Sequence, residues 1–148
     1  DKQISLEKYL LFGVLIFFVF WVILKIFSFK DFIKGLILYD DSNIYYNNQS
    51  APITIKEQEL ISYLSENPFI TAPQVNRIIS DQQFAKSHFT SLRNKLIGDL
   101  NEKLFILTKN EKCIIETKLP KDNRLKAYKA DSSIIKKKIS FFNFLFKS

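Results

Sequence analysis

The chain has 148 residues and carries 22 Lys and Arg against 15 Asp and Glu, with one His, one Cys and three Gly. This length allows one modest domain with attachments. The single cysteine excludes a disulfide-stapled scaffold, and the few glycines leave no loop that could cradle a phosphate. No ligand cluster has zinc-binding spacing and no pair of titratable groups points to catalysis, so neither an enzyme nor a cofactor is expected.

The first element expected is a membrane-spanning helix. An uncharged run, YLLFGVLIFFVFWVIL, extends from Tyr9 to Leu24, and apolar residues continue to Phe29. A core helix would show polar residues on one face, and a signal peptide would end in small residues, and the run has neither feature. We therefore predict a single transmembrane helix over residues 9–29, preceded by a flank over residues 1–8.

The residues around this helix indicate how it lies in the bilayer. Trp21 and Lys25 are the predicted membrane contacts, because an indole favours the interface and a lysine stem can snorkel out of the hydrocarbon. Two lysines precede the run and three follow it within ten residues. This excess predicts a single-pass protein of a cell inner membrane with its C-terminal part in the cytoplasm.

Short β-prone runs follow the apolar segment. Residues 36–39 and 44–46 are expected to pair as a hairpin around the turn-like sequence DDSN at 40–43. A second turn is expected at 47–50, leading to Pro52.

Two short helices are expected next. Thr54 and Glu57 have the spacing of a capping box, and Asn67 before a proline marks the end of that helix. Thr71 and Gln74 have the same spacing, with a proline in the first turn, and predict the start of a second helix.

A longer third helix is expected from about Ala85 to Lys103. Its apolar stripe is formed by four residues at steps of three and four: Phe89, Leu92, Leu96 and Leu100. Residues 104–108 and 113–117 are then expected to pair as a hairpin, followed by an exposed loop at 118–123 and a short strand at 124–129.

Positive charge is concentrated in the second half of this region. Residues 84–130 hold eleven Lys and Arg against five acids, whereas residues 30–83 hold four against seven. Such a surplus points to an anionic partner. A hairpin, two helices, a basic third helix and a basic hairpin form the order of a winged helix-turn-helix, whose third helix enters the major groove of DNA. The predicted fold class is therefore α+β, with a transmembrane helix followed by a winged helix-turn-helix domain over residues 30–131.

Four stretches resemble, in order, the first helix, second helix, recognition helix and wing of OmpR/PhoB-type output domains: ITIKEQELI at 53–61, ITAPQV at 70–75, HFTSLRNKL at 88–96 and IET at 115–117. The resemblance covers about residues 35–130 and implies DNA binding. It departs at the wing, where KLPKDNR at 118–124 replaces the Gly-rich sequence of that family. A transmembrane helix stands in place of a receiver domain, similar to membrane-anchored ToxR-like regulators with the domain order reversed.

The charge and the resemblance together predict the DNA contacts. The third helix contributes Ser87, His88, Ser91, Arg93, Asn94 and Lys95. The wing contributes Lys109, Lys112, Lys118, Lys121, Arg124 and Lys126. Cations suit phosphates or base edges, and the Ser and Asn side chains suit base edges.

Residues 132–148 are expected to form a basic, aromatic tail. Four phenylalanines are its predicted membrane or partner contacts: Phe141, Phe142, Phe144 and Phe146. The function expected is a membrane-anchored, one-component transcriptional regulator that binds DNA, alone or as a homodimer. The alternative is a small subunit of a membrane protein complex that uses a winged-helix fold for protein contacts.

Overall fold

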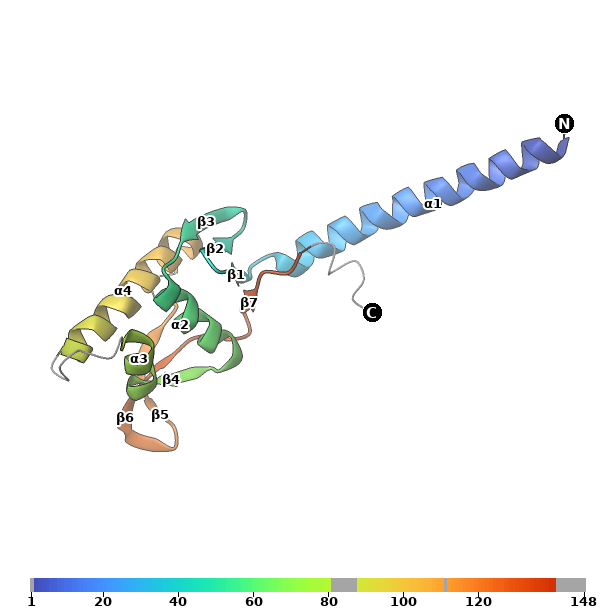
Figure 1. Ribbon diagram of the computed structural model, residues 1–148. Coiled ribbons are helices and arrows are strands. Elements are labelled where there is room, and N and C mark those ends of the chain that lie inside the picture. The colour runs from blue at the N-terminus through green and yellow to red at the C-terminus, as the bar shows by residue number, and fades with distance from the viewer. Residues whose placement is uncertain (1, 81–87, 111, 141–148) are drawn as a thin grey trace. The chain divides into compact units, whose positions relative to one another are not determined.

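The computed structural model describes residues 2–80, 88–110 and 112–140. The chain divides into two units (Figure 1), of which Gly35–Lys138 is the larger and the residues on either side of it form the other. The class is mixed α+β with a long apolar helix near the N-terminus.

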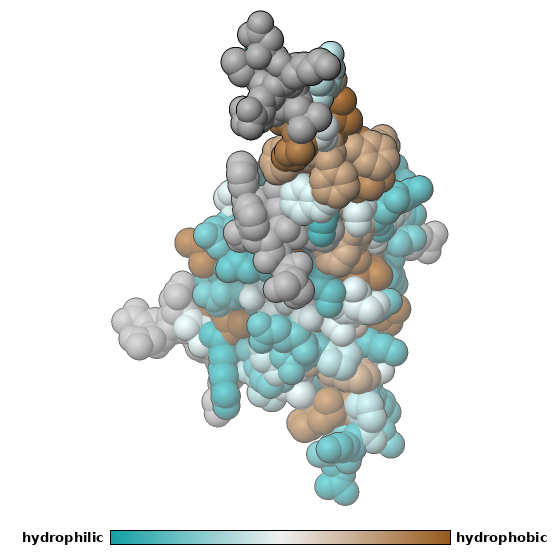
Figure 2. All heavy atoms as spheres, turned by 90° about the vertical axis from the view of Figure 1, so that its right-hand side faces the viewer, coloured by the Kyte–Doolittle hydropathy of each residue, from teal (hydrophilic) through white to brown (hydrophobic). Residues whose placement is uncertain are grey.

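Helix α1 (Lys2–Ile33) is continuous and contains the whole of the predicted 9–29 span. Its part from Lys8 to Ile33, 26 residues, is long and apolar enough to cross a membrane. At about 1.5 Å per residue this part extends for roughly 39 Å, against a hydrocarbon core of roughly 30 Å. Tyr9, Leu11 and Phe17 are each more than 70% exposed, and Figure 2 shows large apolar side chains gathered on this helix. The predicted membrane-spanning helix is confirmed in length and composition.

The first sheet of the larger unit has the strand order β3-β2-β1-β7. The predicted hairpin is present as β1 (Ile37–Tyr39) and β2 (Asn43–Tyr46). A further strand, β3 (Gln49–Pro52), was not predicted. It pairs with β2 across a two-residue turn in which Asn47 and Asn48 have left-handed φ angles of 45° and 68°. Asparagine tolerates this conformation, which is the one that two-residue hairpin turns need.

The turn between β1 and β2 is organised by the carboxylate of Asp40. Its Oδ1 accepts backbone N–H groups from Ser42 at 3.0 Å and Asn43 at 2.8 Å, and its Oδ2 accepts the Tyr45 hydroxyl at 2.6 Å. The Tyr45 hydrogen bond, followed by the backbone N–H groups and the nearby Lys138 ammonium, lowers the pKa of Asp40 to about 2. The hairpin turn therefore depends on an ionised side chain.

Both predicted capping boxes are present. At the start of α2 (Ile55–Glu66), Glu57 N–H donates to Thr54 Oγ1 and Thr54 N–H donates to Glu57 Oε2. A short strand, β4 (Phe69–Thr71), leads into α3 (Ala72–Ile79). There Thr71 N–H donates to the Gln74 side chain at 2.8 Å.

Helix α4 (Phe89–Thr108) is longer at its C-terminal end than predicted. The expected strand at 104–108 is wrong, because Leu104 and Leu107 continue the helical spacing of Ile97 and Leu100 and are buried with them. The helix ends at Lys109, whose φ of 62° is left-handed. The predicted stripe is also shifted, since its members Phe89, Leu92 and Leu96 are only partly buried beside the core.

The second sheet has the order β4-β6-β5 and is antiparallel. β5 (Ile115–Leu119) and β6 (Asp122–Lys129) form a hairpin around Pro120 and Lys121. The predicted loop at 118–123 is therefore mostly strand and tight turn. The partner of β5 is β6, not the 104–108 segment.

Residues 135–137 form β7 (Ile135–Lys137), which pairs in parallel with β1. Ile135 is 2% exposed and belongs to the core. The predicted start of a tail at residue 132 is therefore wrong, and the compact unit extends to Lys138. One core unites both sheets with three helices; its fully buried aliphatic members are Ile37, Ile44, Leu60, Ile61, Leu64, Ile70, Val75, Leu100, Leu104 and Ile135.

Candidate nucleic-acid interface

The first turns of α4 present polar side chains to solvent. His88, Ser91 and Lys95 lie at steps of three and four and are all exposed, as is the neighbouring Asn94. Residues at these spacings share one helix face. The structure thus brings together four of the six contacts predicted on this helix. Ser87 lies outside the described residues.

Arg93 is not on this face, and its place among the predicted contacts is wrong. The side chain is 6% exposed. Its Nε donates to the Tyr128 hydroxyl and its Nη1 to Asn76 Oδ1, both at 2.9 Å. These bonds join α4 to β6 and α3. The guanidinium is therefore an internal tie between three elements and not a surface contact.

Lys109 and Lys112 are exposed but lie at the other end of α4. The helix has 20 residues, so its ends are about 30 Å apart at ~1.5 Å per residue. The prediction that these two lysines belong to the wing is wrong, because residues 104–108 are helical and the connection to β5 carries the lysines instead.

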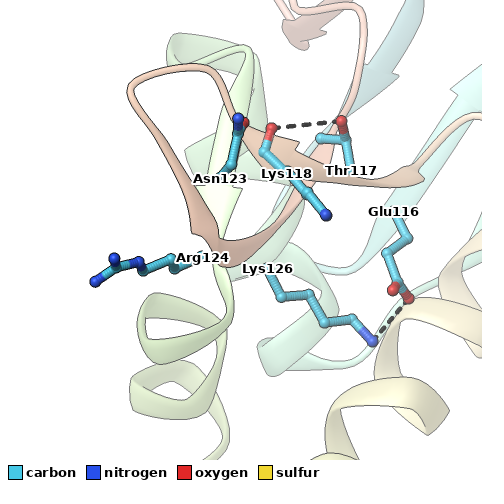
Figure 3. Close-up of a pocket in the computed structure, with 6 residues that line it drawn as sticks. All are labelled: Glu116, Thr117, Lys118, Asn123, Arg124 and Lys126. Carbon is cyan, nitrogen blue, oxygen red and sulfur yellow. Dashed lines mark hydrogen bonds and ion pairs between the residues drawn. The ribbon is translucent and has the colours of Figure 1, made fainter.

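The remaining predicted cations are on the β5–β6 hairpin. Lys118, Lys121 and Arg124 are exposed, and Lys126 is 36% exposed. Residues from both strands of the hairpin line an open hollow of about 580 Å³. They are drawn in Figure 3: Glu116, Thr117, Lys118, Asn123, Arg124 and Lys126.

The charged side chains of this hairpin include one pair of facing lysines and one ion pair. Lys118 and Lys126 are directly opposite each other in the strand register. Like charges in this position repel and destabilise a hairpin. Lys126 Nζ lies 2.8 Å from Glu116 Oε2, and this hydrogen bond raises the pKa of Lys126. Figure 3 shows these two side chains turned toward each other, with Arg124 extending away from the pair.

Sequence reasoning missed two features. Glu116, read only as part of the IET stretch, proves to be the ion-pair partner of Lys126. The second feature is an open apolar groove of about 470 Å³ beside α4, lined in part by Ile55, Ile79, Leu92 and Leu96. Ile55 is 75% exposed at the first turn of α2. A single sequence does not reveal this exposure, because the helical spacing of the neighbouring residues does not show which face of the helix other elements leave exposed.

The predicted membrane contacts Trp21 and Lys25 both lie within α1, where Lys25 Nζ is 5.7 Å from the centre of the Trp21 ring. The four predicted phenylalanine contacts at 141–146 lie outside the described residues. Among the residues that the structure describes, no group of three His, Cys, Asp or Glu side chains could hold a metal ion.

Comparison of the chain with models of protein families, with curated proteins and with solved structures finds no match.

Proposed function

We propose that Gly35–Lys138 is a winged helix-turn-helix unit that binds DNA and that α1 anchors it in a membrane. The observation that carries the proposal is the cationic β5–β6 hairpin. Lys118 and Lys126 face each other across the strands, and Lys121 and Arg124 are exposed nearby. Phosphate groups that bind the hairpin relieve this repulsion. Their binding also releases the counterions that are condensed on the DNA.

The arrangement of elements supports this proposal. β4 lies between α2 and α3 in the chain and pairs with β6 of the hairpin. The hairpin is thereby fixed to the same helices that pack against α4. In the proposed complex the exposed face of α4 enters the major groove and the hairpin lies beside a phosphate backbone.

The membrane part of the proposal follows from α1 and the lysines after it. Since the DNA-binding unit follows the helix directly, it must lie on the side of the membrane that holds DNA. Three lysines after the span agree with a cytoplasmic position. A signal that changes the position, pairing or release of the anchored unit would then control access to DNA.

The test uses the full chain in lipid nanodiscs and a pool of random genomic DNA fragments at two salt concentrations. We expect recovered fragments to share a site, with weaker binding at the higher salt. The double variant Lys118→Gln/Lys126→Gln should reduce affinity, and the matched control Lys109→Gln/Lys112→Gln, which removes the same charge at the far end of α4, should not. Equal losses in both variants would indicate attraction by net charge alone.

The apolar groove favours a second candidate, a subunit of a membrane complex that binds protein through this unit. An isoleucine that is 75% exposed beside partly buried leucines is suited to a protein contact. Failure of the nanodisc-held chain to recover DNA even at low salt would favour this candidate. Capture of a stoichiometric partner that is lost in Ile55→Ser would then support it.

A further inference from the structure

We propose that Glu116 competes with DNA phosphate for Lys126. In the free protein its carboxylate is hydrogen-bonded to the Lys126 ammonium, and this bond must break when DNA binds. The inference rests on the proposed DNA-binding function and deepens it. It identifies one residue that lowers the affinity of the hairpin for a phosphate backbone.

The geometry around Lys126 carries the inference. Glu116 is opposite Tyr128, and Lys118 is opposite Lys126, in pairs that lie two positions apart on the same strands. Opposed residues point to the same face of a sheet, and so do residues two positions apart on one strand. One carboxylate and two ammonium groups therefore share one face of the hairpin, and the carboxylate is bonded to one ammonium at 2.8 Å.

The ring of Tyr128 holds Lys126 in place. Its ammonium is 5.8 Å from the centre of the Tyr128 ring, and Tyr128 is 2% exposed and bonded to Arg93. The buried network thus fixes the ring over which Lys126 lies. Lys126 is the cation of this face that is already positioned, so an arriving phosphate gains most by binding it.

The ion pair is weak enough to be exchanged. Glu116 is 61% exposed and Lys126 is 36% exposed, and exposed pairs of this kind are screened by water and salt. A phosphate in the same hollow would replace the carboxylate as acceptor, while Glu116 turns to solvent. A carboxylate left near a phosphate also repels it, so Glu116 opposes binding both before and after the exchange.

The experiment measures affinity of the full chain in nanodiscs for a short random-sequence DNA duplex over a range of salt concentrations. Glu116→Gln should tighten binding by about three- to tenfold at low salt, the range expected when one exposed ion pair and one repulsion are removed. The matched control is Asp122→Asn, which removes one negative charge from the same hairpin. Asp122 bonds the backbone N–H of Arg124 at 3.0 Å, a bond that asparagine can keep. This control should change affinity less than twofold.

A double-variant cycle separates competition at Lys126 from a general charge effect. In the Lys126→Gln background, Glu116→Gln should have a smaller effect, because the competition for the ammonium is absent and only the repulsion between the carboxylate and phosphate remains to be removed. Equal tightening in both backgrounds, or equal tightening by Asp122→Asn, would overturn the inference while leaving DNA binding intact. No binding by the wild-type chain or by any variant at low salt would instead overturn the proposed function, and the inference with it.

Discussion

Replacement of Arg93 by alanine tests whether this residue is an internal tie. The change removes two hydrogen bonds of 2.9 Å, to Tyr128 on β6 and Asn76 on α3. A hydrogen bond to a charged group contributes about 1.5–3 kcal/mol. Relaxation and entry of water recover part of that, so we expect a loss of about 3 kcal/mol in the free energy of unfolding.

This loss corresponds to a large shift in melting temperature. The unit Gly35–Lys138 has 104 residues. With an unfolding entropy of about 2.1 cal/mol/K per residue, 3 kcal/mol lowers the melting temperature by roughly 14 °C. Thermal unfolding followed by circular dichroism on the full chain in detergent measures it. The matched control Lys95→Ala, on the exposed face of the same helix, should stay within about 0.5 kcal/mol of wild type.

The pairing with Tyr128 gives a second check on the same reasoning. Tyr128→Phe removes the hydroxyl that accepts from Arg93 Nε and keeps the ring. Alone it should cost about 1–2 kcal/mol. In the Arg93→Ala background it should cost much less, because the losses of stability on substituting two hydrogen-bonded residues are not additive. An Arg93→Ala chain as stable as wild type that binds DNA less tightly would refute the internal tie and return Arg93 to the contact surface.

Three further outcomes are expected. Lys103→Met should destabilise the chain by about 3 kcal/mol, because Glu57 is 2% exposed and both of its oxygens accept from Lys103 Nζ; Lys112→Met is the matched control in urea unfolding. The pKa of Asp40 is lowered from 3.8 to about 2, so its stabilisation is present above pH 4 and is lost as the pH falls toward 2. Acid unfolding of Asp40→Asn should therefore show less additional loss over that interval than wild type, and an identical profile would refute the assignment. Trp21 fluorescence should be quenched by brominated lipids if α1 spans the bilayer, whereas quenching only by soluble iodide would contradict insertion.

Local signals in the sequence predicted local structure well. The capping boxes at Thr54 and Thr71 and the first hairpin are present, because each depends on residues within a few positions of one another. The run LFILT at 104–108 was misread as strand. A short apolar run fits a buried strand or a buried helix equally well, and only the packing of Leu104 and Leu107 in the core decides between them.

Long-range contacts could not be predicted in the same way. β7 pairs with β1 across almost a hundred residues of chain, and its lysine-rich sequence resembles a solvated tail. Arg93 and Lys95 are two positions apart on one helix, and either cation suits an exposed face by composition. Which of them is buried depends on Tyr128 and Asn76, which come from other elements.

The smaller set of cations on the proposed surface makes the salt dependence of DNA binding a quantitative test. Eight predicted cations would give a slope of log K against log salt of about −7, at roughly 0.9 per neutralised phosphate. With Arg93 internal and Lys109 and Lys112 at the far end of α4, the proposed surface keeps five of them: Lys95, Lys118, Lys121, Arg124 and Lys126. The expected slope is then about −4 to −5. A slope near −7 would mean that DNA also contacts the far end of α4, which the proposed complex does not allow, whereas a slope near zero would mean that the hairpin does not bind phosphate at all.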